Sequence, residues 1–70
     1  MVEYKATQAG QVYYISVKPG DAVKKGMNLV GVEMMKVQTD TIASVDGKVR
    51  DVKVKVNDFV SLGDVLLTTE

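Results

Sequence analysis

The stretch GQVYYISVKPGDAVKKGMNLV at residues 10–30 returns in altered form as GKVRDVKVKVNDFVSLGDVLL at residues 47–67. The two copies lie 37 positions apart, with their turn residues and apolar residues in the same register. Identical residues occur at Gly10/Gly47, Val12/Val49, Val17/Val54, Lys18/Lys55, Asp21/Asp58, Val23/Val60, Gly26/Gly63 and Leu29/Leu66. Because a solenoid needs about three or more repeats, two copies predict one domain of two similar halves related by a pseudo-two-fold axis.

Each copy alternates short valine-rich runs with residues that favour turns. Pro-Gly-Asp at residues 19–21 and Asn-Asp at residues 57–58 follow the first runs, and Gly26 and Gly63 come next. Short runs bounded by such residues are typical of an all-β sandwich or barrel, and no stretch has helical periodicity. We predict strands at residues 2–6, 11–17, 28–34, 37–43, 48–56 and 65–69, with short apolar connections at 22–23 and 59–60.

The first strand of each copy contains a break in its alternation. The apolar positions change parity between Val12 and Ile15, and again between Val49 and Val52. A strand cannot keep one face inward across such a change without a bulge or a bend. The sequence therefore predicts an irregularity at the same place in both halves. Turn conformations with positive φ are expected at four glycines: Gly20, Gly26, Gly47 and Gly63.

Composition excludes several classes of function. Nine basic and nine acidic residues cancel, which argues against binding to nucleic acid or to an anionic membrane. No apolar run is long enough to insert into a bilayer, and residues 1–5 are not expected to be a signal peptide, because no apolar region follows them. Cysteine and histidine are both absent, so thiol chemistry, histidine catalysis and a histidine metal site are excluded. We expect residues 1–70 to form one small cytoplasmic domain.

The segment that joins the two copies is expected to form a β-hairpin with its turn at Met35-Lys36. Pairing about that centre sets Met34 opposite Val37, Val32 opposite Thr39, and Leu29 opposite Ile42. Two-residue hairpin turns prefer Asn-Gly or Asp-Gly because their central residues take positive φ, so Met-Lys is a poor choice. Residues that depart from the usual sequence preferences of a turn often do so for a functional reason. On the residues alone, however, a lysine at a turn is more commonly a solvated charge.

The residues around this turn resemble a known attachment motif. Glu33-Met34-Met35-Lys36-Val37 is similar to the Glu-Ala-Met-Lys-Met motif of biotin carboxyl carrier domains, in the biotinyl/lipoyl attachment family. The similarity extends over residues 9–68. It implies a flattened β-barrel, the barrel-sandwich hybrid or hammerhead, built from two four-stranded antiparallel sheets.

The sequence also departs from the family pattern. Val37 stands where the family usually has a second methionine, and residues 6–10, Ala-Thr-Gln-Ala-Gly, replace its Ala-Pro-Met-x-Gly.

The resemblance implies a carrier rather than an enzyme. Lys36 would be joined covalently to biotin by a biotin protein ligase, which would read the flanking residues Glu33, Met34, Met35 and Val37. The biotin arm would then carry carboxyl groups between a biotin carboxylase and a carboxyltransferase. No catalytic residue and no metal are expected in this chain.

Three other interpretations remain. A lipoyl carrier has the same fold and a central lysine, but lipoyl domains usually carry Asp before that lysine, where this chain has Met35. An unmodified hammerhead can serve as a structural or adaptor module, as in membrane-fusion proteins of efflux systems. An autonomous enzyme is disfavoured by the small size and by the missing histidine and cysteine.

Overall fold

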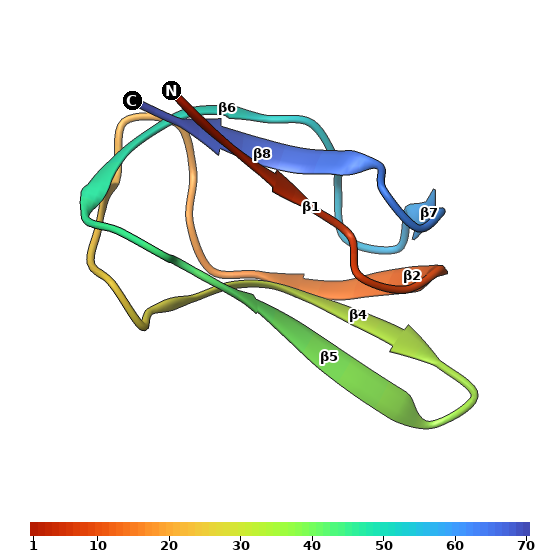
Figure 1. The fold of residues 1–70 in the computed structure, drawn as a ribbon. Helices are drawn as coiled ribbons and strands as arrows, with labels where there is room; N and C mark the ends of the chain where they lie inside the picture. The colour runs from red at the N-terminus through yellow and green to blue at the C-terminus, as the bar shows by residue number, and fades with distance from the viewer.

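The computed structural model describes residues 1–70 as eight strands and no helix, so no helix could span a membrane. The strands are β1 (Val2–Lys5), β2 (Gly10–Ile15), β3 (Ala22–Val23), β4 (Asn28–Met34), β5 (Val37–Ile42), β6 (Gly47–Val52), β7 (Phe59–Val60) and β8 (Val65–Thr69). They form two four-stranded antiparallel sheets, in the orders β1-β8-β6-β3 and β5-β4-β2-β7. Figure 1 shows the two sheets as layers with the β4–β5 hairpin extending from one of them.

The two sheets are related by the predicted pseudo-two-fold symmetry. Each strand of one sheet has its counterpart 37 residues away in the other, and β2 and β6 correspond residue for residue. Single hydrogen bonds repeat as well. Val12 N donates to Asp58 O over 2.8 Å, and Val49 N donates to Asp21 O over the same distance. The internal repeat of the sequence is therefore the repeat of the fold.

The predicted irregularity is present in both halves. The register of β2 against β4 shifts between Val12 and Tyr14, and the register of β6 against β8 shifts between Val49 and Asp51. Each is a bulge of the kind that lets a strand change the face it buries. The parity change in the sequence is thus explained by a bulge at equivalent positions.

The core lies between the sheets and follows the same symmetry. Its 13 residues include Ala6, Val12, Val23 and Leu29 together with their counterparts Ala43, Val49, Val60 and Leu66. Deeply buried aliphatic side chains of this kind supply most of the stabilisation of a small domain, at about 25 cal/mol per Å² of apolar surface buried.

Four details of the sequence-based expectation were wrong. The connections at 22–23 and 59–60 are the short strands β3 and β7, and β6 ends at Val52 rather than at residue 56. Ile42 pairs with Asn28 instead of Leu29, because a bulge between Asn28 and Val30 shifts the register.

Gly47 is the fourth correction. It has no positive φ, whereas the turn glycines Gly20, Gly26 and Gly63 do. Gly47 begins β6, and a Cβ there would lie 2.9 Å from the carbonyl oxygen of Glu70. Glycine is required here because the backbone of Glu70 comes so close that a Cβ would have no room.

Candidate functional site

The β4–β5 hairpin extends beyond the strand beside it. β2 pairs with β4 as far as Gln11 opposite Glu33, whereas β4 and β5 continue to the pair Met34 and Val37. The turn of residues 35–36 therefore stands past the edge of the sheet. In Figure 1 it lies at one end of the molecule, and the two chain termini lie at the other.

The turn adopts the backbone conformation that its residues disfavour. Met35 has φ 50° and Lys36 has φ 68°, so both central residues take the positive φ of a type I′ turn. Asn57 is the one other non-glycine residue with positive φ. Left-handed backbone costs an ordinary residue roughly 1–2 kcal/mol, and strained residues of this kind concentrate at functional sites.

The side chains of the turn are free of the rest of the protein. Met35 is 89% exposed, Lys36 is exposed, and the single ion pair of the structure joins Lys53 to Asp51 elsewhere. The Lys36 amine has no hydrogen-bond or ion-pair partner. An amine presented in this way is accessible to a large partner.

The flanking residues occupy two faces of the hairpin. Glu33 is exposed, and its Oε2 accepts a 2.9 Å hydrogen bond from Gln38 Nε2 on the neighbouring strand. Met34 is half-buried, whereas its partner Val37 is 58% exposed. The structure thus brings all five motif residues to the hairpin end, with Glu33 on one face and Met34 and Val37 on the other.

Gln8 is a residue of this site that sequence reasoning missed. It lies between β1 and β2, and its Nε2 donates to the carbonyl oxygens of Val32 (3.3 Å) and Val37 (3.1 Å). These two bonds link both hairpin strands to the body of the domain. The available signal was the departure from the family pattern at residues 6–10, where Gln8 stands in the position of the family's methionine.

Comparison with known proteins assigns this chain to a family. A family model described as Biotin-requiring enzyme matches residues 2–69. A biotin/lipoyl attachment protein of Bacillus subtilis is 42% identical over 59 residues, covering 84% of this chain and 81% of the relative. The mitochondrial propionyl-CoA carboxylase alpha chain of Sus scrofa is 43% identical over 61 residues, which cover 87% of this chain but 8% of that protein.

A solved lipoyl domain has the same fold. The lipoyl domain of the 2-oxoglutarate dehydrogenase complex from Azotobacter vinelandii has a TM-score of 0.84 and 29% sequence identity, covering 100% of this chain and 96% of that chain. The similar proteins therefore include one named for biotin/lipoyl attachment, a carboxylase chain and a lipoyl domain.

Proposed function

This chain belongs to the biotin/lipoyl attachment family, and we propose that it is a biotin carrier domain with Lys36 as the attachment residue. The observation that carries the proposal is the turn itself. Two residues with disfavoured positive φ hold a free amine at the exposed end of a hairpin. That conformation costs stability, which an ordinary surface lysine has no reason to require.

The residues at the turn fit a covalently attached cofactor. The Lys36 amine has no polar partner to lose, and the neighbouring Met35 is almost fully exposed. A modifying enzyme therefore meets a substrate that is already ordered, which lowers the entropic cost of binding and alignment.

The attachment reaction forms an amide at Lys36. The Nζ atom, after loss of a proton, attacks the acyl carbon of biotinyl-adenylate. The new C–N bond replaces the bond between that carbon and the phosphate oxygen, and AMP leaves. The chain supplies the nucleophile, whereas the activated acyl group and the base belong to the biotin protein ligase.

When attached to Lys36, biotin would hold a carboxyl group during its transfer from a biotin carboxylase to a carboxyltransferase. The chain's own part is to hold the arm at the end of a rigid hairpin and to keep that end clear of the remaining surface. Tethering raises the local concentration of the arm at both active sites without tight docking. We therefore assign no catalytic step to this domain.

Biotin is preferred to lipoate because Met35 precedes Lys36 where lipoyl domains usually carry Asp. The likeness to a solved lipoyl domain makes lipoate the second candidate. The deciding experiment offers the purified protein to a biotin ligase and to a lipoate ligase, each with its cofactor and ATP, and weighs the products. A single biotin adduct that disappears in Lys36→Arg is expected. Preferential lipoylation, or an adduct that persists in this variant, would contradict the proposal.

A further inference from the structure

The four methionines of this chain differ in how open their side chains are to solvent. Met35, in the turn between β4 and β5, is 89% exposed, the largest exposed fraction among the large apolar side chains. Met34 is half-buried, and Met27 is packed against the core. Because an oxidant must reach the sulfur atom, exposure decides which thioether is converted to a sulfoxide first. Met35 is therefore more open to oxidation than either of these two.

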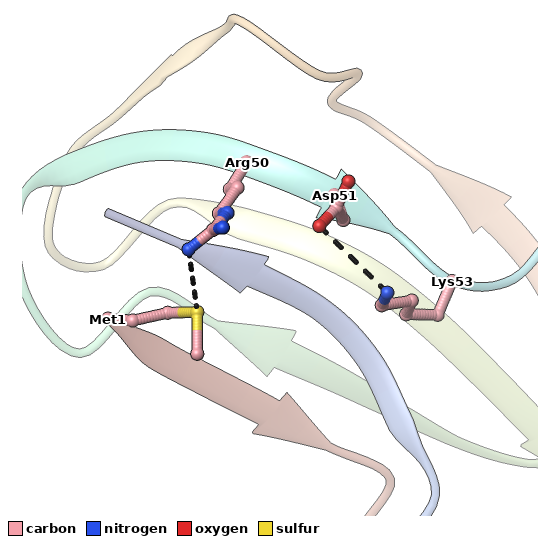
Figure 2. A network of polar contacts seen from close by, with 4 residues as sticks. All are labelled: Met1, Arg50, Asp51 and Lys53. Carbon is pink, nitrogen blue, oxygen red and sulfur yellow. Dashed lines mark hydrogen bonds and ion pairs between the residues drawn. The ribbon is translucent and has the colours of Figure 1, made fainter.

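Met1 is the other exposed methionine, but its sulfur atom is engaged. The side chain is 73% exposed, and its Sδ accepts a 3.5 Å hydrogen bond from Nη1 of Arg50 (Figure 2). A thioether attacks an oxidant through a lone pair of its sulfur, so a hydrogen bond from a cation to that sulfur lowers its reactivity. The Met1 sulfur is the one that accepts a hydrogen bond. Met35 thus presents the most reactive sulfur atom of the chain.

The position of Met35 connects this reactivity to the attachment turn. Met35 directly precedes the exposed Lys36, and the positive φ of both residues holds them in one tight turn. An enzyme that encloses the Lys36 amine during ligation must therefore also cover the Met35 side chain. A thioether suits such a contact because it is apolar and polarisable. A sulfoxide does not, because its polar oxygen has to leave water without a hydrogen-bond partner.

We propose that Met35 is a site of reversible oxidation by hydrogen peroxide, and that the sulfoxide slows the loading of Lys36. This inference rests on the proposed function, because it concerns the ligation of that lysine. A lone pair of the sulfur attacks one peroxide oxygen, so that the S–O bond forms as the O–O bond breaks. Sulfur loses two electrons to the peroxide. The hydrogen on the transferred oxygen passes to the leaving hydroxide, which departs as water.

The oxidation is reversible and local. A methionine sulfoxide reductase, with a dithiol as reductant, returns the thioether and releases water, while the dithiol becomes a disulfide. The exposed Met35 side chain is accessible to such an enzyme. Because that side chain is almost fully in solvent, the added oxygen displaces no packed neighbour, and the fold should be unchanged.

The first test maps the oxidation of the purified protein by dilute hydrogen peroxide. Proteolysis and mass spectrometry follow the gain of one oxygen at each methionine. We expect Met35 to react fastest, Met1 more slowly and the two half-buried methionines slowest. Arg50→Ala removes the hydrogen-bond donor of Met1, so the oxidation of Met1 should then approach that of Met35. Oxidation that begins at Met27 or Met34 would overturn the proposal.

The second test compares the ligation of biotin to Lys36 before and after oxidation, with the peroxide removed. The kcat/KM of ligation should fall about tenfold, because the sulfoxide oxygen loses its hydration in the complex. Treatment with methionine sulfoxide reductase should restore the original value. The circular dichroism spectrum and the free energy of unfolding should stay the same, which excludes damage to the fold as the cause.

Two leucine variants are the matched controls. Met35→Leu has no sulfur in the turn, so peroxide should leave its ligation rate at the value of the same variant untreated. Met1→Leu retains Met35 and should lose as much activity as the wild type. An equal loss in Met35→Leu, or undiminished ligation of wild type oxidised at Met35, would refute the proposal. Failure of the untreated wild type to be ligated would instead contradict the carrier assignment itself, so the two failures are distinguishable.

Discussion

The carbonyl oxygen of Val37, the residue directly after the turn lysine, accepts a 3.1 Å hydrogen bond from the side-chain amide of Gln8. The same amide reaches the carbonyl of Val32 on the opposite strand of the hairpin. The hairpin end, which has no neighbouring strand beyond Glu33, is therefore fixed to the domain by one side chain. The contact joins the hairpin end to a residue remote from it in sequence.

Replacing Gln8 should loosen the hairpin end. In Gln8→Ala we expect faster amide hydrogen exchange at residues 34–38 and a ligation rate at Lys36 that is several-fold lower, because the turn must be ordered during the reaction. The free energy of unfolding should fall by only about 1 kcal/mol, since the freed carbonyls can bind water. Gln11→Ala is the matched control, because the Gln11 side-chain amide also donates to a backbone carbonyl, that of Asn57 (3.3 Å). Unchanged exchange in Gln8→Ala would show that the contact is not needed for order.

Lys36→Arg should abolish ligation and leave stability unchanged. Arginine stays protonated and cannot act as the amine nucleophile, and an exposed conservative change alters stability by no more than about 0.5 kcal/mol. Mass spectrometry and chemical denaturation measure the two effects. The contrasting variant is Val49→Ala, 2% exposed in the core, which should cost about 1.5–3 kcal/mol yet still be ligated while folded. A strongly destabilised Lys36→Arg would make Lys36 a structural residue.

Met35→Asn should separate stability from function. Asparagine tolerates positive φ better than methionine, so unfolding should require up to about 1 kcal/mol more free energy, while ligation slows if the ligase contacts Met35. The matched control is Asn57→Gly, at φ 80°, whose counterpart is Gly20 at φ 95°. It should stabilise the protein without changing ligation. Faster ligation of Met35→Asn would argue against recognition of the methionine.

Stability should decline at high pH through Tyr14. Burial, the hydrogen bond to Asp40 and the negative charges nearby raise the pKa of Tyr14 to about 12. A raised pKa favours the protonated phenol in the folded state, so this contribution is complete below about pH 10, the unfolded pKa. It is lost as the pH rises from there to about 12. The unfolding free energy of wild type should fall more steeply over this range than that of Tyr14→Phe, and parallel curves would exclude the linkage.

The architecture was predictable because the information for it is local and repeated. The parity change at Val12 and Ile15 is a direct consequence of strand geometry, and its recurrence at Val49 and Val52 marked the bulges in both halves. The two-residue hairpin turn centred on Met35-Lys36 likewise predicted the positive φ values found at both residues. The roles of the motif residues remain predictions.

The errors concern strand ends, irregularities of strand pairing and contacts between segments distant in sequence. The pairing of Leu29 with Ile42 was wrong because a bulge on β4 cannot be read from side-chain types alone. Gly47 requires room for the carbonyl of Glu70, a contact made by the last residue of the chain. Gln8 likewise contacts segments distant in sequence, so periodicity gave no indication of it, and the departure from the family pattern at residues 6–10 was the one available signal.

The placement of the termini has a consequence for how this domain can be joined to other proteins. Val2 pairs with Thr69, and both lie at the end of the molecule opposite residues 35–36 (Figure 1). A polypeptide fused to either terminus would therefore begin on the far side from Lys36 and would not obstruct that lysine. The same closeness of the ends means that a short linker could close the chain into a ring. The termini and the turn that bears Lys36 lie at opposite ends of the molecule, so the length of a fusion can change without any change to that turn.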